Sequence, residues 1–220
     1  MSKIGKEAED IINRSPFIRE AITENLINIS ALARKIKPEI EEKMGAPVNE
    51  GAIVMAIKRM APGYYHKINV KINKFMSDLG DFLVRSDLTI FTFDNSPSIP
   101  KLQSSLMDEI ANERDIFYTV SRGVTETTII TGQKLTPRIQ ELFANEILKS
   151  HKENLASVTI KLDETNTEIS GIYYYFLKHL AWEGINILEV ISTTNEITFV
   201  VEGDLVDQAF SVLMRLKIRN

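Results

Sequence analysis

The chain has 220 residues, with 26 Lys or Arg against 30 Asp or Glu, and no cysteine. Apolar residues make up 44% and charged residues 25%, which is typical of a globular protein that buries its own core. The lack of cysteine excludes a disulfide framework, thiol catalysis and thiolate-bound metal. The longest apolar runs, 52–57 and 172–177, are far shorter than the roughly 20 residues that cross a membrane, and no signal peptide follows Met1. We therefore expect a cytoplasmic protein with no membrane contact.

Helical patterns fill the first third of the chain. A cap and a first-turn proline at Ser15-Pro16 indicate the start of one helix. Ser30 is expected to begin a second helix, in which Pro38 should cause a kink or a break. Asn49 is expected to cap a third helix, and apolar residues at helical spacing predict a fourth over 66–79.

From residue 87 onward, strand and helix patterns alternate and their order repeats. Asp94 corresponds to Asp163 and Ile130 to Val201, at shifts of 69 and 71 residues, which indicates an internal duplication. Each half follows the order β-α-β-β-α, with a further strand supplied by the segment between the halves. The expected strands are 87–94, 116–121, 127–131, 155–162, 185–192 and 196–201, and the expected helices are 100–113, 136–147, 169–183 and 204–217.

These patterns predict an α+β fold. Two helices on one face of an antiparallel sheet form a sandwich of the ferredoxin-like type. We therefore expect an N-terminal all-helical module at 1–80, followed by two ferredoxin-like (βαββαβ) units at 81–150 and 151–220.

The second half carries residues specific enough to indicate a family. The stretches Asp163, Ile169-Ser-Gly-Ile172, Leu180-Ala-Trp-Glu-Gly-Ile-Asn-Ile187 and Ile197-Thr-Phe-Val-Val201 resemble an ACT domain. The similarity is closest to the tandem ACT units that regulate aspartokinases, and it covers 155–217 well and 87–148 weakly. The 80 residues before the repeat are too few for a kinase domain, and the sequence has no glycine-rich phosphate loop.

The resemblance implies a regulatory protein whose paired units bind a small-molecule effector, often an amino acid. The ligand is expected where the first strand of a unit meets its first helix, because a helix N-terminus favours a carboxylate and a glycine lets the backbone approach closely. Lys101 stands in the first unit where the second has Gly171, so we expect one competent unit and one that is partly structural. The candidate ligand-binding residues are Asp163, Glu164, Asn166, Ile169, Ser170, Gly171, Asn186 and Ile187. The alternative interpretation of 163–168 is a solvated acidic loop.

The helical module admits a second hypothesis, because the expected helices at 28–36 and 49–59 resemble a helix-turn-helix. Residues 1–86 carry 14 basic and 11 acidic side chains, whereas 87–220 carry 12 and 19. The module is therefore mildly basic, as a DNA-binding element is. Its candidate DNA contacts are Arg34, Lys35, Lys58 and Arg59. The alternative is a structural or partner-docking bundle, which the long, acidic gap between the two helices favours.

We expect no enzymatic activity, no cofactor and no metal. His66, His151 and His179 have no partner at ligand spacing, and no nucleophile–base motif is present. In the helix predicted over 169–183, Tyr173 is expected in the core. We expect a homodimer that senses its effector and signals through the helical module. If that module binds DNA, the protein is a ligand-responsive transcription regulator. The alternative is an adaptor that binds no ligand, or a regulatory subunit of an amino-acid biosynthetic enzyme.

Overall fold

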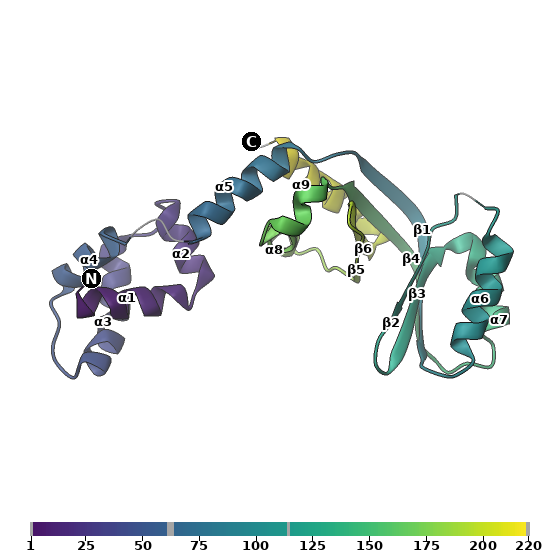
Figure 1. Ribbon diagram of the computed structural model, residues 1–220, viewed down its shortest axis with the longest axis horizontal. Coiled ribbons are helices and arrows are strands. Elements are labelled where there is room, and N and C mark those ends of the chain that lie inside the picture. The colour runs from purple at the N-terminus through teal and green to yellow at the C-terminus, as the bar shows by residue number, and fades with distance from the viewer. Residues whose placement is uncertain (1, 61–63, 114, 219–220) are drawn as a thin grey trace. The chain divides into compact units, whose positions relative to one another are not determined.

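The computed structural model describes residues 2–60, 64–113 and 115–218 (Figure 1). The chain divides into two compact units, residues 1–73 and 74–220. The first is a helical unit and the second contains the sheet, and each has buried apolar clusters of its own. Among the described residues, no helix is long and apolar enough to cross a membrane.

The helical unit is built from short amphipathic helices around one core. Ile12, Ile40 and Ile53 are fully buried at its centre. Ser15 accepts a hydrogen bond from the backbone N–H of Ile18, as predicted for a cap. The helices are α1 (Lys3–Asn13), α2 (Pro16–Thr23), α3 (Ile29–Met44), α4 (Glu50–Lys58) and α5 (Tyr64–Ser77), the last of which runs on into the sheet unit. The sequence interpretation missed α1, which is capped by Ser2.

Helix α3 differs from its prediction at its cap, and of the two effects expected at Pro38 the break does not occur. Asn28, rather than Ser30, provides the cap, through a 3.0 Å bond from the N–H of Ala31. The helix is not broken at Pro38, which lies inside it. Because Pro38 is exposed, water can bind the carbonyl that loses its helical partner. The connection to α4 is therefore only residues 45–49, much shorter than the sequence suggested.

The sheet unit contains a six-stranded, fully antiparallel sheet in the order β2-β3-β1-β4-β6-β5. Its strands are β1 (Phe82–Asp94), β2 (Tyr118–Arg122), β3 (Glu126–Gly132), β4 (Leu148–Lys161), β5 (Glu189–Ser192) and β6 (Glu196–Glu202). Its helices are α6 (Ile99–Ile110), α7 (Thr136–Leu142), α8 (Ile172–Trp182) and α9 (Val206–Ile218), with short 3-10 turns η1 (Gln133–Leu135), η2 (Glu164–Glu168) and η3 (Gly203–Leu205).

Two long strands join the halves of the sheet. The first part of β1, Phe82–Arg85, pairs with the end of β4, and the first part of β4, from Leu148, pairs with the end of β1. Each half thereby gains the further strand that its sequence pattern lacked. The predictions at 87–94 and 155–162 located only the later parts of these strands. The predicted boundary at 150/151 lies inside β4, because pairing with β1 continues through it.

The sheet curls at irregularities in these two strands. Asp87 and Asn154 both have left-handed backbone conformations, with φ of 56° and 57°, next to shifts of register between β1 and β4. In Figure 1, α6 and α7 lie against one part of the sheet and α8 and α9 against the other. Phe91 packs beneath the first pair of helices, and Phe199 contacts Phe176 of α8. The opposite face buries a cluster drawn from both ends of the sheet: Leu88, Ile90, Ile130, Leu155 and Val200, with Phe117, Leu188 and Ile191 at its edge.

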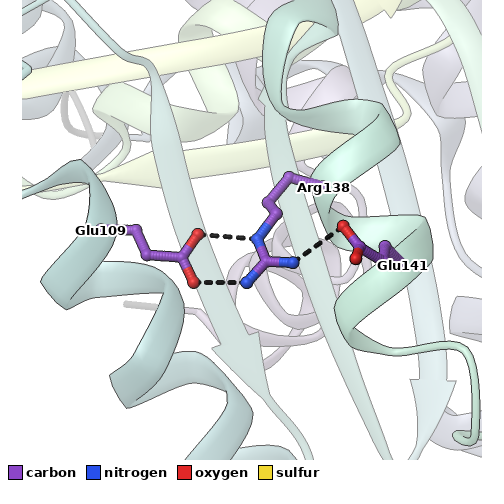
Figure 2. Close-up of polar contacts among 3 residues, drawn as sticks. All are labelled: Glu109, Arg138 and Glu141. Atoms are coloured by element: carbon purple, nitrogen blue, oxygen red, sulfur yellow. Dashed lines mark hydrogen bonds and ion pairs between the residues drawn. The ribbon is translucent and has the colours of Figure 1, made fainter.

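Helices α6 and α7 are joined by a charged clamp, which Figure 2 shows. Arg138 of α7 donates two hydrogen bonds, of 2.7 and 2.6 Å, to the carboxylate of Glu109 on α6. Glu141 accepts a third, of 2.8 Å. The Arg138 guanidinium lowers the pKa of Glu109, and the two carboxylates raise the pKa of Arg138. The clamp links α6 to α7 at the surface, above the apolar cluster through which both helices pack on the sheet.

Candidate functional site

A pocket of about 490 Å³ opens where η2 meets α8. Gly171 precedes the helix with a φ of 90°, a conformation that side chains disfavour, and no side chain caps the helix. The backbone N–H groups of Ile172 and Tyr173, at the start of this turn, can therefore bind an anion. The lining residues are Asn166, Thr167, Ile169, Gly171, Ile172, Tyr173 and Tyr174.

In the acidic loop before the pocket, the Asp163 carboxylate is hydrogen-bonded to a residue of the same loop. One Asp163 oxygen accepts from the backbone N–H of Thr165 at 2.9 Å and from its hydroxyl at 2.7 Å. These bonds lower the pKa of Asp163, which therefore caps its own loop. Glu164 is exposed at the start of η2, and Ser170 is exposed beside the pocket, without lining it.

Asn166 has two roles in this geometry. It lines the pocket and is only 8% exposed. Its side-chain amide donates to the carbonyl of Asp163 at 2.8 Å and to the carbonyl of Thr194 in the β5–β6 hairpin. The residue therefore ties the acidic loop to the hairpin, which the sequence prediction did not include.

The residues that line the pocket differ from the set that the sequence predicted as ligand-binding. Asn186 and Ile187 follow the C-terminus of α8, whereas the pocket lies at its N-terminus. Tyr173 was expected in the core, but it is 45% exposed, lines the pocket and shares a 2.5 Å hydrogen bond with Ser192. The core stripe of α8 is instead Ile172, Phe176 and Leu180. The place of Tyr173, two residues after Gly171 in the first helical turn, is the signal that could have indicated its position at the pocket.

The first half of the sheet has a pocket of about 400 Å³ at the start of α6, but one of its own carboxylates occupies that place. Glu146 accepts hydrogen bonds from the hydroxyls of Ser96, at 2.6 Å, and Ser98. Lys149 lies 2.8 Å from Asp94, and this ion pair raises the pKa of Lys149. The two strand–helix junctions therefore differ, since the junction at α8 lacks an equivalent internal carboxylate among its lining residues.

The candidate DNA contacts lie on α3 and around the end of α4. Arg34 forms an ion pair with Glu50 at 3.2 Å, so this guanidinium already has a partner. Lys35, Lys58 and Arg59 are exposed. Arg59 also borders a groove between α1 and α4. In the described part of the chain, no three His, Cys, Asp or Glu side chains are grouped so as to hold a metal ion.

Searches of family models and of curated proteins gave no match to the sequence. Solved structures do match the fold. The regulatory subunit of aspartate kinase from Thermus thermophilus is 12% identical, with a TM-score of 0.51 over 63% of this chain and 97% of that one. Aspartate kinase from Clostridium acetobutylicum is 14% identical, with a TM-score of 0.51 over 63% of this chain and 34% of that one. Part of this chain therefore has the fold of the regulatory portion of aspartate kinase.

Proposed function

We propose that the protein is a sensor whose effector, an amino acid, binds in the pocket at the start of α8. The observation that carries the proposal is the open first turn of α8 behind Gly171, facing a pocket large enough for such a ligand. The effector carboxylate binds the free N–H groups, and the acidic side of the η2 loop, with Glu164, receives its ammonium group. The Clostridium acetobutylicum protein of the same fold is described as an allosteric enzyme, which supports a regulatory role.

The sensing part consists of two interleaved ACT-like units, with the helical module as its output. In the first unit, Glu146 closes the corresponding strand–helix junction to an effector, because a carboxylate of the chain itself sits where an effector carboxylate would bind. A homodimer passes the signal on by a shift between two arrangements, to the extent that the effector binds them with different affinity. Sedimentation equilibrium tests the dimer, and a monomer at all concentrations would contradict it.

The effector site is tested by thermal unfolding in the presence of each of the twenty amino acids. An effector at 100 times its dissociation constant adds about 2.7 kcal/mol, which is a rise in Tm on the order of 5–10 °C. Ile169→Trp fills the pocket without straining the backbone and should abolish the rise. Gly171→Val should also abolish it, whereas Gly123→Val, in the β2–β3 turn, should leave it unchanged.

An absence of any rise in Tm with wild-type protein would contradict the sensor. If every amino acid that raises the Tm of the wild-type protein raises it equally in Ile169→Trp, the α8 site is contradicted. The first outcome favours an adaptor or regulatory subunit that binds no effector.

DNA binding by the helical module is the second candidate function. The short connection between α3 and α4 favours it, since residues 45–49 approach the usual turn of about three to four residues. Exposed Lys35, Lys58 and Arg59 are its expected phosphate contacts. Binding to genomic fragments should weaken steeply with salt, and Lys58→Glu should reduce it more than Lys3→Glu on α1. Binding that is absent or insensitive to salt would contradict this candidate.

A further inference from the structure

A second cavity, of about 580 Å³, lies in the first half of the sheet unit and shares no lining residue with the α8 pocket. Its apolar lining includes Leu88 and Leu135, which are 1% and 8% exposed, together with Ile116 and Phe117. A volume of this size suits a small metabolite. Four charged side chains of both signs also line it: Arg85, Asp87, Asp115 and Lys134.

These charges are not neutralised by one another. Asp115 and Lys134 form no ion pair within 4.0 Å in the described part of the chain. Asp87 accepts a 2.9 Å hydrogen bond from Ser86, its neighbour. The guanidinium carbon of Arg85 lies 5.7 Å from the centre of the Phe117 ring. Two cations and two carboxylates therefore surround an apolar cavity without pairing across it.

The two halves of the sheet differ at the position that borders this cavity. Asn154 on β4 corresponds to Asp87 on β1, since both have φ near 57° and both precede a buried leucine. We call the irregularity at each of these residues a bulge. In the second half, Gly203 of η3 touches the bulge at Asn154: a Cβ on Gly203 would lie 2.6 Å from the carbonyl oxygen of Asn154. The strand registers place Gln133 of η1 at the position of Gly203. Gln133 therefore carries a side chain where the second half has Gly203, and in the first half Asp87 and Gln133 both line the cavity.

We propose that this cavity is a binding site for a zwitterionic amino acid with an apolar side chain. Arg85 and Lys134 bind its carboxylate, and Asp87 and Asp115 bind its ammonium group. The side chain of the ligand packs on Leu88, Leu135 and the ring of Phe117. The left-handed conformation of Asp87, costly for a residue with a side chain, holds the bulge that shapes the rim.

The test is calorimetric titration of the full chain with L-leucine and L-phenylalanine. The Ile169→Trp background removes the α8 pocket, so binding that remains lies elsewhere, and the variants at Arg85 and Lys134 assign it to this cavity. Arg85→Gln and Lys134→Gln should each weaken binding at least tenfold, as expected for the loss of a charge-assisted hydrogen bond. Arg122→Gln, at the exposed end of β2, is the matched control and should leave the affinity unchanged. The thermal unfolding of each variant shows that it is folded.

Probes with one charge removed test the zwitterion itself. Isoamylamine and 4-methylpentanoate should each bind at least tenfold more weakly than L-leucine. Equal affinity for 4-methylpentanoate and L-leucine would overturn the assignment of the two carboxylates. The site itself is overturned if neither amino acid binds the Ile169→Trp chain, or if Arg85→Gln and Lys134→Gln both bind as the control does. The two sites are told apart by their variants: a rise in Tm that is lost in Ile169→Trp belongs to the α8 pocket, and one that persists there but is lost in Arg85→Gln belongs to this cavity.

Discussion

At residue 203 the backbone of η3 touches the bulge of β4, and only the missing side chain allows this contact. The φ of Gly203 is not left-handed, so the requirement for glycine arises from the neighbouring Asn154 carbonyl. Gly132, at the end of β3, has nothing within 4 Å of a Cβ placed on it. The two glycines therefore have opposite tolerance for a methyl group.

Gly203→Ala should destabilise the protein by about 1–3 kcal/mol, because its Cβ would overlap backbone that cannot move aside freely. Gly132→Ala should change stability by no more than about 0.5 kcal/mol. Urea unfolding of both variants measures the difference. Equal effects of the two substitutions would contradict the close contact between η3 and the β4 bulge.

Among the elements, α3 shows how a helix tolerates a proline. Pro38 lies on an exposed position in a sixteen-residue helix whose other face carries Leu32, Ile36 and Ile40 into the core. Burial of that face stabilises α3 more than the lost backbone hydrogen bond costs. The apolar stripe therefore outweighs the local preference of proline.

Pro38→Ala should raise the free energy of unfolding by about 1–2 kcal/mol. It restores the N–H that α3 lacks, and part of this gain is offset by the greater freedom of the unfolded chain. Urea unfolding measures the change, with Lys37→Ala as the control for a surface substitution in the same turn. A loss of stability in Pro38→Ala would show that proline is required by the geometry of the helix.

The clamp between α6 and α7 gives a second prediction for the elements. Arg138→Gln removes the guanidinium that bridges Glu109 and Glu141, so Tm should fall. Salt screens exposed charges, so the fall should be smaller at 1 M than at 0.05 M NaCl. A difference in Tm that is the same at both salt concentrations would contradict an electrostatic role.

For the sheet unit as a whole, the curl of the sheet places charges from distant strands near one another. Burial raises the pKa of Glu189 on the edge strand β5, and the charge of Glu126 on β3 raises it further. Between these two strands the sheet order has β1, β4 and β6. The influence of Glu126 on Glu189 therefore arises from the curl and not from pairing.

Glu126→Gln should lower the pKa of Glu189, which an NMR pH titration measures directly. Glu189→Gln should stabilise the protein at neutral pH, because a carboxyl with a raised pKa is destabilising in its charged form. This gain should shrink as the pH falls through the raised pKa to the ordinary value of glutamate, since both states are then protonated. A Glu189 pKa that does not respond to Glu126→Gln would contradict the curl.

The sequence by itself determined several helix starts and the order of strands and helices. The caps at Ser15 and Asn49, the start of α7 at Thr136 and the alternation of strands and helices after residue 87 follow from short-range preferences that neighbouring residues set. The same is true of Gly171 at the head of α8, where a left-handed conformation requires glycine. The sequence could therefore predict the junction at which this pocket lies, whereas ligand binding there stays a prediction.

The tertiary structure decided the length of the two central strands, the surroundings of the pocket and the difference between the two halves of the sheet. The early parts of β1 and β4 are strands because each completes the other half of the sheet. The sequence did not predict the contact between Tyr173 at the pocket and Ser192 of the hairpin, because the distance between α8 and the hairpin depends on how α8 packs against the sheet. The difference between the halves, with Glu146 at one helix and an open turn at the other, likewise depends on contacts between residues far apart in sequence.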